Sequence, residues 1–584
     1  MVATAQTATG SHFHALLNGY PMNCPRAVVQ TTNRKGRMLF RSSLTGTSAG
    51  FLDSIRGSAG QWHKLSLRFL SGYPCKLSIH PHRSASFFCS ISTGQASKDR
   101  FVCYTSSGET VQQSYRWPDN QKPRICILGG GFGGLYTALR IETLVWTDDK
   151  KPQVLLVDQS DKFVFKPLLY ELLSGEVDPW EIAPSFTELL KGTSVQFIKD
   201  KVKLLRPSDH LDNPGKNDLG RSCSGGSVLL ESGLLVEYDW LVLALGAAAK
   251  LDVVPGSAEL AYPFVTLEDA IKIDDKLRML ERDHFSNDSS PISVAIVGCG
   301  YSGVELAATI SERLKSFGIV HAINVETSIC PSAPSGNREA ALKVLSSRNT
   351  KLHLGYFVSS ITEAPSKDWV VIPRTEQVIS VDNEVKTNRK FILELKPAQR
   401  GLQSQILEAD LVLWTVGSKS LVPELEPSDQ PRTLPLNGRG QAETDETLRV
   451  KGHPRIFAIG DSAAMRDSSG KLLPATAQVA FQQADFAGWN LWASINDRPL
   501  LPFRFQYLGE MMTLGRNDAA FSPSFIEGLT LDGPIGHTAR KLAYLLRMPT
   551  NEHRLKVGIS WLAKSAVDTI ASLQTTIVSV FSGS

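Results

Sequence analysis

Residues 124–139 read Arg-Ile-Cys-Ile-Leu-Gly-Gly-Gly-Phe-Gly-Gly-Leu-Tyr-Thr-Ala-Leu, a short apolar run that leads into glycines and then into a helical pattern. Gly129, Gly131 and Gly134 have the spacing G-x-G-x-x-G. The first glycine permits a tight turn, the second lets a pyrophosphate approach the backbone, and the third lets helix and strand pack closely. Free amides at the positive end of the helix then bind the phosphates. A single copy is a weak signal, because many glycine-rich turns match it.

A second copy strengthens this interpretation. Residues 292–307 read Ile-Ser-Val-Ala-Ile-Val-Gly-Cys-Gly-Tyr-Ser-Gly-Val-Glu-Leu-Ala, with Gly298, Gly300 and Gly303 at the same spacing. Two such loops predict two dinucleotides bound by one chain. The sequence therefore predicts an α/β fold with two Rossmann-like dinucleotide-binding domains.

Each glycine-rich loop is followed by an apolar strand that ends in an acid. The first strand is Gln153–Asp158 and the second is Ala322–Glu326. A carboxylate at this position accepts a hydrogen bond from a ribose 2′-hydroxyl and repels a 2′-phosphate, so Glu326 favours NADH. An acid at an exposed strand end is the alternative interpretation of Glu326. Two later apolar segments, one after each loop, both end in glycine: Tyr238–Gly246 and Ala409–Gly417.

The N-terminal hundred residues differ in charge from the rest of the chain. The 584 residues carry a net charge of +4 and 21% charged residues, which favours neither a nucleic-acid coat nor an acidic tail. Within residues 1–100, Asp53 and Asp99 are the only acids against twelve Lys and Arg. This segment, rich in Ser, Thr, Gly and Ala, is typical of an organelle transit peptide with its linker. A disordered basic arm that binds a polyanion is the alternative.

The sequence contains no local metal or dithiol motif and no long apolar run. Cys126, Cys223, Cys299 and Cys330 form no C-x-x-C pair, so neither a zinc site nor a redox dithiol is predicted. Cys126 and Cys299 adjoin the loop strands, as buried apolar residues do. Because no run of 18 apolar residues occurs, any membrane contact should be interfacial.

A third glycine turn occurs late in the chain. Residues 454–463 read Pro-Arg-Ile-Phe-Ala-Ile-Gly-Asp-Ser-Ala, which predicts a strand, a turn at Gly460 and Asp461, and a helix beginning near Ser462.

Three glutamines follow that turn. Gln478 and Gln482 are four residues apart and therefore share one helical face, with Gln483 beside them. Alanine and valine flank them, which indicates a partly buried segment in which the amides must find partners.

Taken in order, these segments resemble the two-dinucleotide-binding flavoproteins. More narrowly, the chain is similar to the type II (alternative, rotenone-insensitive) NAD(P)H:quinone oxidoreductases, closest to the plant chloroplast or mitochondrial C group. The resemblance covers roughly residues 122–562. The segments that carry it are Gly129–Gly134, Phe165-Lys-Pro-Leu-Leu-Tyr-Glu171, Gly298–Glu305, Gly460-Asp461 and Ala477-Gln-x-Ala-x-Gln-Gln483.

The resemblance implies FAD in the first loop and NAD(P)H, as substrate, in the second. Asp461 would bind the ribityl chain, and the helix beginning near Ser462 would point at the flavin C2 carbonyl. The sequence departs from the family at Cys330-Pro331, where an apolar Leu-Pro turn is usual, so cofactor preference stays open. The cofactor-binding residues that we expect are Gly129, Gly131, Gly134, Asp158, Lys166, Gly246, Gly298, Gly300, Gly303, Glu326, Gly417, Gly460 and Asp461.

The resemblance also implies three catalytic residues. Glu305 would lie close to the nicotinamide and the flavin, although an acid favoured by the helix dipole is the plainer interpretation. Gln478 and Gln482 would face the quinone head group. Hydride would pass from the nicotinamide to the flavin, and two electrons would then pass to a membrane quinone of the plastoquinone, ubiquinone or naphthoquinone type.

The C-terminal region mixes basic and apolar residues. From Trp561 onward apolar residues recur at helical spacing, and Asp568 is the only acid between Gly558 and Ser584. Such a helix can lie in a bilayer interface; packing on its own domain or on a second copy in a homodimer is the alternative. We expect a peripheral membrane protein of chloroplast or mitochondrion. The predicted divisions are residues 1–100 (transit peptide and linker), 122–290 and 421–505 (FAD), 291–420 (NAD(P)H) and 506–584 (membrane association).

Two rival functions remain open at this point. A sulfide:quinone oxidoreductase needs a cysteine pair beside the flavin, and Cys299 with Cys330 is a poor candidate because both belong to the nicotinamide domain. A nucleotide-sensing flavoprotein, resembling the apoptosis-inducing factors, would reduce quinones slowly.

Overall fold

The computed structural model describes residues 66–68, 74–76, 113–208, 225–287, 290–364, 390–398, 400–426 and 434–582, with backbone alone for 66–68, 74–76, 287 and 568–582. The chain divides into two compact units, Met1–Val111 and Gln112–Ser584. In the first unit, β1 (Ser66–Arg68) and β2 (Pro74–Lys76) form an antiparallel pair. The rest of the predicted transit peptide lies outside the described residues.

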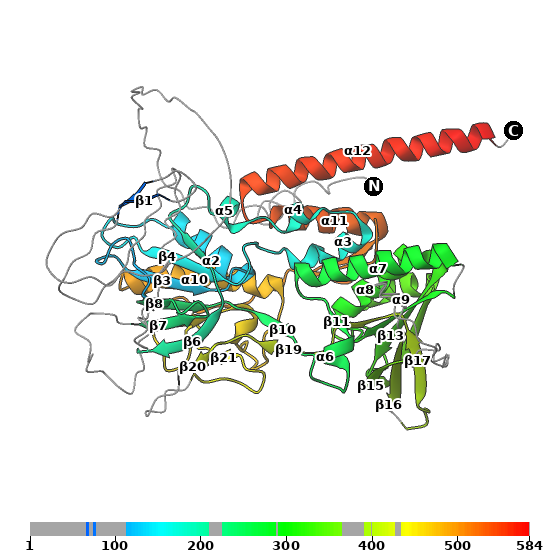
Figure 1. The fold of residues 1–584 in the computed structure, drawn as a ribbon, viewed down its shortest axis with the longest axis horizontal. Coiled ribbons are helices and arrows are strands. Elements are labelled where there is room, and N and C mark those ends of the chain that lie inside the picture. Colours follow the sequence, from blue (N-terminus) through cyan, green and yellow to red (C-terminus); the bar gives the residue numbers. More distant parts are fainter. Residues whose placement is uncertain are drawn as a thin grey trace, which may run out of the picture. The chain divides into compact units, whose positions relative to one another are not determined.

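A parallel five-stranded sheet is built around the first glycine-rich loop (Figure 1). Alternate residues of the strand that leads into this loop, residues 124–128, pack into different cores, because successive side chains of a strand point to opposite faces. Ile125 and Ile127 pack in the core that includes α2 (Phe132–Thr143) and α10 (Ala477–Ile495). Cys126 and Leu128 pack with an antiparallel sheet on the other face. In spatial order the strands are β22 (Ile456–Ala458), β9 (Trp240–Leu243), β3 (Arg124–Leu128), β4 (Gln153–Asp158) and β5 (Gln196–Lys199).

The second glycine-rich loop belongs to another five-stranded parallel sheet with the same three-layer plan. Val294 and Ile296 pack with helices, whereas Ala295 and Val297 pack with an antiparallel sheet. The strand order is β11 (Tyr262–Pro263), β18 (Leu411–Trp414), β12 (Ile292–Val297), β13 (Gly318–Asn324) and β14 (Thr350–Leu354). Its helices are α7 (Leu267–Asn287), α8 (Tyr301–Leu314) and α9 (Ser335–Ser347).

The antiparallel layers complete the duplication. Beside the first parallel sheet lie β20 (Glu424–Leu425), β6 (Val202–Pro207), β7 (Gly226–Leu230) and β8 (Leu235–Tyr238); beside the second lie β15 (Tyr356–Glu363), β16 (Phe391–Pro397) and β17 (Gln405–Ala409). The antiparallel pair of β10 (Ala247–Ala249) and β19 (Ser418–Ser420) joins the two dinucleotide-binding halves. Gly246 directly precedes β10, and Gly417 directly precedes β19. The polar tract at residues 209–224 lies outside the described residues.

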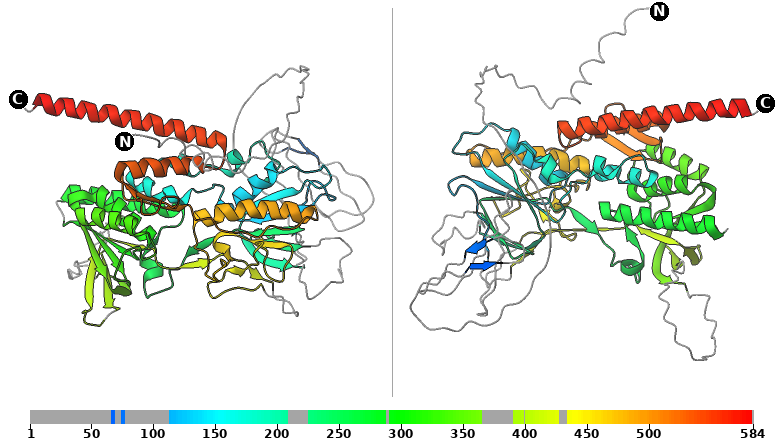
Figure 2. Two further views of the ribbon diagram at one scale, coloured as in Figure 1. Left: turned by 180° about the vertical axis from the view of Figure 1, so that it is seen from behind. Right: turned by 45° about the horizontal axis from the view of Figure 1, so that its top comes forward.

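The C-terminal region adds a small antiparallel sheet and two helices (Figure 2). The sheet contains β24 (Gly509–Thr513), β25 (Ala519–Pro523) and β26 (Leu531–Asp532), and α11 (Gly533–Leu546) and α12 (Asn551–Ser582) follow it. Shorter elements are η1 (Lys166–Leu168), α3 (Leu169–Ser174), α4 (Pro179–Ile182), α5 (Phe186–Leu189), α6 (Ser257–Leu260), η2 (Lys315–Phe317), β21 (Ala442–Glu443), η3 (Gly460–Ser462) and β23 (Ala463–Ala464).

Candidate functional site

The first glycine-rich loop has the geometry that a bound phosphate requires. Gly129 has φ +97°, a conformation that side chains disfavour. A Cβ on Gly134 would lie 1.8 Å from the carbonyl oxygen of Gly129, so helix α2 packs as close as only glycine allows. A Cβ on Gly131 would meet no atom within 4 Å. The loop is therefore open where a pyrophosphate would lie, and its residues fit a dinucleotide.

The second glycine-rich loop repeats this geometry. Gly298 has φ +100°, and a Cβ on Gly303 would lie 1.8 Å from the carbonyl oxygen of Gly298. A Cβ on Gly300 would again meet no atom within 4 Å. The duplication seen in the sequence is thus a duplication of backbone geometry, and both loops fit a pyrophosphate.

In each parallel sheet, the strand that follows the glycine-rich loop and its helix (β4 or β13) ends in a polar residue. The side chain of that residue holds the loop in place. Asp158 ends β4, and its carboxylate accepts hydrogen bonds from the amides of Gly130 (2.6 Å) and Ser160 (2.7 Å). In the other sheet, Asn324 ends β13, and its Oδ1 accepts from the Cys299 amide (3.3 Å).

The predicted end of the second strand is therefore wrong by two residues. The chain bends after Asn324, because the Nδ2 of this side chain donates to the Ser328 carbonyl (2.8 Å) and closes the turn. Glu326 lies in the bend and is exposed, and its backbone carbonyl accepts from the Gly355 amide (3.1 Å). Sequence analysis missed Asn324, although a polar residue two positions before the acid was a visible signal.

Three charged residues gather beside the first glycine-rich loop. Burial lowers the pKa of Lys166, whereas the carboxylates of Asp461, Asp158 and Asp269 act to raise it. Burial raises the pKa of Asp461 against the opposing charge of Lys166. Burial also raises the pKa of Asp158, against the hydrogen bonds from the Gly130 and Ser160 amides and the charge of Lys166. The structure thus brings Asp158, Lys166 and Asp461 together from three segments that are far apart in sequence.

The turn at Gly460 and Asp461 differs from its prediction. No α-helix begins near Ser462: residues 460–462 form η3, and Ala463 and Ala464 then pair with β21. The Ser462 hydroxyl accepts from the Gly246 amide (3.0 Å). The nearby α-helix is α10, whose Ala480 would lie 3.4 Å from a Cβ on Gly460.

Gln483 is a residue that sequence analysis left without a role. Its side chain is buried, and its Oε1 accepts from the Gly460 amide (2.7 Å). This contact fixes the glycine turn against α10. The signal in the sequence was an amide flanked by alanines, which indicated burial but not its partner.

Gln478 and Gln482 both bond to the same extended segment before β24. The Gln478 amide accepts from the Leu508 N–H (3.2 Å) and donates to the Gly509 carbonyl (3.2 Å). The Gln482 side-chain amide accepts from the Gln506 N–H (2.9 Å) and donates to the Gln506 carbonyl (2.8 Å). The prediction of a partly buried face with bonded amides is confirmed. Each carboxamide keeps a second N–H, because an amide nitrogen carries two.

Glu305 occupies a buried position at the start of α8. It is 8% exposed, and its carboxylate accepts from the Thr513 amide (3.0 Å). Burial raises the pKa of Glu305 to about 7, and the negative charge of Glu171 adds to this, while the Thr513 amide, Arg540 and the Tyr170 hydroxyl oppose it. A carboxyl group that titrates near neutral pH is equipped to take up or release a proton.

The C-terminal helix α11 contributes an unforeseen guanidinium to this cluster. Arg540 is fully buried and forms an ion pair with Glu171, on α3. Its Cζ lies 5.2 Å from the ring centroid of Tyr544, and the Tyr544 ring is 5.5 Å from that of Phe165. The cluster thus joins the segment after the first loop, the start of α8 and the C-terminal region.

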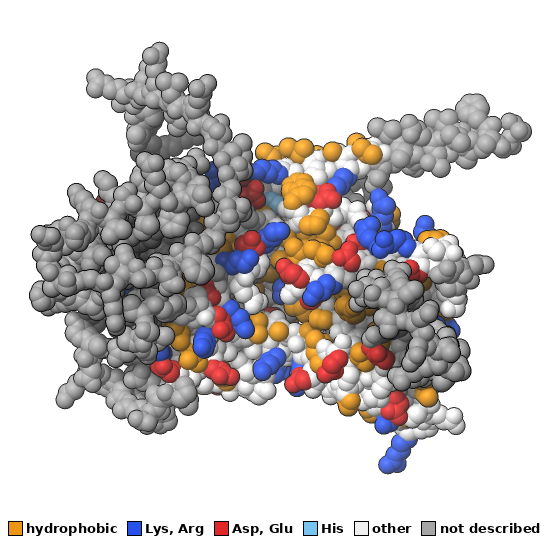
Figure 3. Space-filling view, viewed as in Figure 1, with side chains coloured by type: hydrophobic (Ala, Val, Ile, Leu, Met, Phe, Trp, Pro, Cys, Tyr) orange, Lys and Arg blue, Asp and Glu red, His pale blue; other side chains and the backbone are white. Residues whose placement is uncertain are grey.

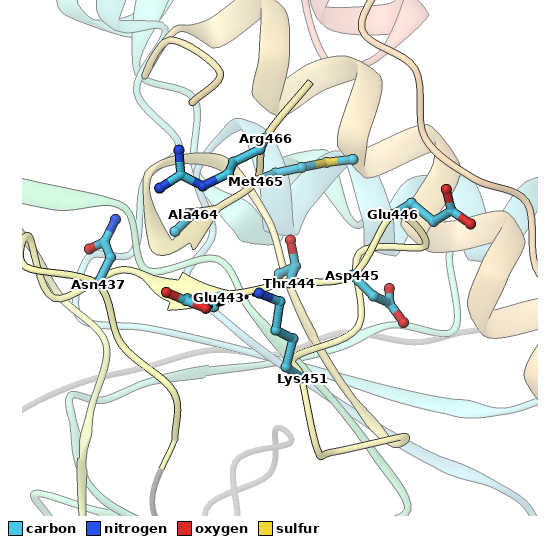
Figure 4. A pocket seen from close by; sticks show the side chains of 9 residues that line it. All are labelled: Asn437, Glu443, Thr444, Asp445, Glu446, Lys451, Ala464, Met465 and Arg466. Atoms are coloured by element: carbon cyan, nitrogen blue, oxygen red, sulfur yellow. Dashed lines mark hydrogen bonds and ion pairs between the residues drawn. The ribbon is translucent and has the colours of Figure 1, made fainter. Parts of the chain in front are cut away.

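A separate cavity of about 170 Å³ contains none of the predicted site residues (Figure 4). Its walls carry both charges, and Lys451 pairs with Glu443 across 3.0 Å. The lining residues are Asn437, Glu443, Thr444, Asp445, Glu446, Lys451, Ala464, Met465 and Arg466. We assign no function to this cavity.

Comparison with known proteins identifies the family. The family model described as pyridine nucleotide-disulphide oxidoreductase matches residues 123–484. The chain is 66% identical over 479 residues to the Arabidopsis thaliana alternative NAD(P)H-ubiquinone oxidoreductase C1, chloroplastic/mitochondrial, covering 82% of this chain and 88% of that protein. It is 40% identical over 447 residues to the demethylphylloquinone reductase NdbB of Synechocystis, covering 76% and 97%.

Solved structures agree on the fold. The NDH2 structure from Plasmodium falciparum superimposes with a TM-score of 0.59 at 18% identity, covering 76% of this chain and 98% of that one. The sulfide:quinone oxidoreductase of Aquifex aeolicus has a TM-score of 0.54 at 17% identity, covering 74% and 92%. The predicted α/β class with two dinucleotide-binding folds is confirmed. The chain belongs to the pyridine nucleotide-disulphide oxidoreductase family and, within it, to the type II NAD(P)H:quinone oxidoreductases.

Proposed function

We propose that this chain is an FAD-dependent oxidoreductase that passes two electrons from NAD(P)H to a membrane quinone without pumping protons. The observation that carries the proposal is the pair of matched glycine-rich loops within one compact unit, each open at its second glycine. When bound, FAD supplies the redox chemistry between nicotinamide and quinone. The protein supplies orientation, a dry pocket and proton positions.

The first glycine-rich loop would hold FAD. Its open glycine accommodates the pyrophosphate, and Asp158 stands where a ribose hydroxyl would donate. Lys166 and Asp461 supply a donor and an acceptor for the polar groups between the ADP half and the flavin. This donor set suits a dinucleotide with a neutral polyol linker.

The second loop would hold NAD(P)H, with Glu305 beside the nicotinamide. Glu305 lies two residues after Gly303 on α8, and its carboxylate accepts from the Thr513 amide on β24. With a pKa of about 7, raised by burial, its Oε atoms can hold a proton or release it at neutral pH. Glu305 would therefore position the nicotinamide and supply a proton toward the quinol.

The quinone head group would meet Gln478 and Gln482. Each amide has one N–H bonded to the segment 506–509 and a second N–H left to donate to a quinone oxygen. Phe481 lies between them in sequence, and its ring centroid lies 4.9 Å from that of Phe132, with the two ring planes tilted by 48°. This aromatic cluster gives an apolar wall for a lipid-soluble ring.

The C-terminal helices would place the quinone site at a membrane surface. Leu555, Ile559 and Leu562 of α12 are 65%, 59% and 73% exposed and share one helical face. Hydrophobic side chains gather along the start of this helix at the top of Figure 3. Among the described helices, none combines the length and apolarity needed to cross a bilayer. An interfacial helix suits these facts.

Ion pairs attach the other edge of α12 to the body of the unit. Lys564 pairs with Asp178 and Glu181, both at 2.9 Å. His553 is buried, and its Nε2 lies 2.8 Å from the Glu181 carbonyl. The apolar face formed by Leu555, Ile559 and Leu562 therefore points away from the body of the unit.

Two further proposals rest on the sequence and on a relative's name. The transit-like residues 1–100 and the chloroplastic/mitochondrial name of the Arabidopsis relative support a plastid or mitochondrial location. A homodimer of this chain would form through the same outward apolar face of α12.

The cysteines within the described residues do not favour sulfide chemistry. Cys126, Cys299 and Cys330 are free and buried. Burial raises the pKa of both Cys299 and Cys330 to about 12, so neither supplies a thiolate near neutral pH.

Stopped-flow absorbance tests the proposal. NADH or NADPH should bleach the flavin of the FAD-loaded protein, and a short-tailed plastoquinone, ubiquinone or naphthoquinone should restore its colour. In Gln482→Ala, bleaching should keep its rate while reoxidation slows about tenfold or more. If the flavin bleaches but every quinone leaves it reduced, the quinone role fails and the sensing flavoprotein becomes the better interpretation.

A further inference from the structure

We propose that His537, on α11, is the residue through which a proton from solvent enters a buried polar path that refills Glu305 during turnover. The inference rests on the proposed function, because it concerns the proton that Glu305 would supply toward the quinol. It assigns a role to His537 and Glu176, a buried pair that neither the nucleotide loops nor the quinone-facing amides use.

The reaction needs one proton from solvent for each quinol that forms. A hydride carries two electrons and one proton, whereas a quinone gains two electrons and two protons when it becomes a quinol. The second proton is therefore taken up from water. Glu305 is only 8% exposed, so a path must return a proton to its carboxylate after each release.

Two neighbouring buried pairs join α11 to the segment 171–176. Arg540 pairs with Glu171, and the His537 Nε2 lies 3.3 Å from the Glu176 carboxylate. His537 and Arg540 are three residues apart and share one face of α11. The Glu176 amide donates to the Glu171 carbonyl at 2.9 Å, which keeps the two acids in adjacent positions.

The inner of the two pairs lies next to Glu305. Burial is the main cause of the raised pKa of Glu305, and the charges of Arg540 and Glu171 also act on it. The pair of His537 and Glu176 is therefore one helical turn of α11 away from the groups that surround the Glu305 carboxylate.

Both pairs contain buried polar atoms that have no hydrogen-bond partner among the described residues. These atoms are Glu171 Oε2, Arg540 Nε and Nη1, Glu176 Oε1 and His537 Nδ1. Buried polar atoms are normally bonded to protein or to ordered water. We therefore expect internal water along the two pairs, and a chain of water and polar side chains can conduct a proton toward Glu305.

The outer pair reaches solvent. The His537 side chain is 8% exposed, and the neighbouring Lys541 side chain is 21% exposed. Burial acts to raise the pKa of Glu176, but the hydrogen bond from His537 and the charge of Lys541 outweigh it and lower the pKa to about 2. Glu176 is therefore a lasting anion that orients the imidazole. An imidazole can accept a proton at one nitrogen and release one from the other.

The other charged groups around this pair come from α11, α12 and α8. Lys541 donates to the Glu176 carboxylate at 2.7 Å, and Lys564 of α12 donates to the Glu176 carbonyl at 3.5 Å. Burial raises the pKa of Glu312 on α8, and the charge of Glu176 adds to this shift. Within this group, an imidazole is the kind of side chain that gains and loses a proton between about pH 5 and 8.

Stopped-flow absorbance with added imidazole tests the path. In His537→Gln and His537→Ala, NADH should bleach the flavin at the wild-type rate, whereas reoxidation by a short-tailed quinone should slow about tenfold or more at alkaline pH, where protons are scarce. Millimolar imidazole should restore most of the rate in His537→Ala, because the free base can carry the proton in place of the lost ring.

The matched control is His553→Ala. His553 is another buried histidine of the C-terminal region, and its Nε2 lies 2.8 Å from the Glu181 carbonyl. Any loss of reoxidation rate in this variant would be structural, so imidazole should not restore it.

The outcomes separate this inference from the proposed function. A wild-type protein whose reduced flavin no quinone reoxidises contradicts the proposed function itself. If quinone reoxidises both His537 variants at the wild-type rate over the whole pH range, the inference fails. It also fails if imidazole leaves His537→Ala slow, if both variants lose the NADH step equally, or if His553→Ala responds to imidazole in the same way.

Discussion

The guanidinium of Arg540, on α11, pairs with the carboxylate of Glu171, on α3, inside the protein: the two side chains are 0% and 1% exposed. The residues are 369 positions apart in sequence. This pair links the C-terminal region to the segment that follows the first glycine-rich loop, next to Glu305.

Breaking the pair should destabilise the protein. Arg540→Gln leaves Glu171 buried without a counter-charge, and we expect a loss of about 3–5 kcal/mol in the free energy of unfolding. The control is Lys556→Gln, which breaks an exposed pair with Glu552 (2.9 Å) and should leave the free energy of unfolding close to the wild-type value. Urea denaturation of both variants measures the difference, and an Arg540→Gln value near that of the control would contradict the role of the pair.

The pKa of Glu305 gives a pH dependence with a definite sign. Burial raises this pKa from its unfolded value of 4.5 to about 7, so the folded state holds its proton longer than the unfolded state. Stability is therefore fully present below about pH 4.5 and falls as pH rises to 7, by about 3 kcal/mol. Glu305→Gln removes this loss and should be more stable than wild type at pH 8 but not at pH 4.

Denaturation of Glu305→Gln at the two pH values checks this expectation. The exposed Glu339→Gln is the control and should follow wild type at both. A wild type and a Glu305→Gln variant with parallel stability curves would show that Glu305 does not titrate near neutral pH.

Membrane contact should depend on the outward face of α12. Replacing Leu555, Ile559 and Leu562 by Ser removes three exposed apolar side chains while leaving the Lys564 ion pairs intact. We expect binding to lipid vesicles in a flotation assay to fall about tenfold or more. The control replaces the exposed Val145, Ile271 and Phe285, which lie on other elements, and should float like wild type.

The sequence predicted the features that depend on local spacing. Gly129, Gly134, Gly298 and Gly303 have the predicted geometry because each contact lies within one strand–loop–helix unit. It failed where a distant partner decides the local structure. No α-helix begins near Ser462: residues 460–462 form η3, where the Ser462 hydroxyl accepts from the distant Gly246 amide, and that contact left no mark in the sequence.

The same reason explains the residues that were missed. Arg540 looks like an ordinary helical surface residue, and the alanines beside Gln483 indicate burial without naming its partner. Only the packed structure reveals Glu171 and the Gly460 amide as the partners of these two side chains. Asn324 was missed because the end of β13 is set by cross-strand register, while the acid two residues later drew attention.

The most direct measurement compares Gly134→Ala with Gly303→Ala in one spectrophotometer. Each Cβ would lie 1.8 Å from a loop carbonyl oxygen, so each should disable its own loop. Gly438→Ala, where a Cβ meets no atom within 4 Å, is the control. Gly134→Ala should purify without flavin. Gly303→Ala should keep its FAD. Dithionite should bleach this flavin, whereas NADH should not. A Gly303→Ala protein that NADH bleaches at the wild-type rate would contradict the assignment of the two loops.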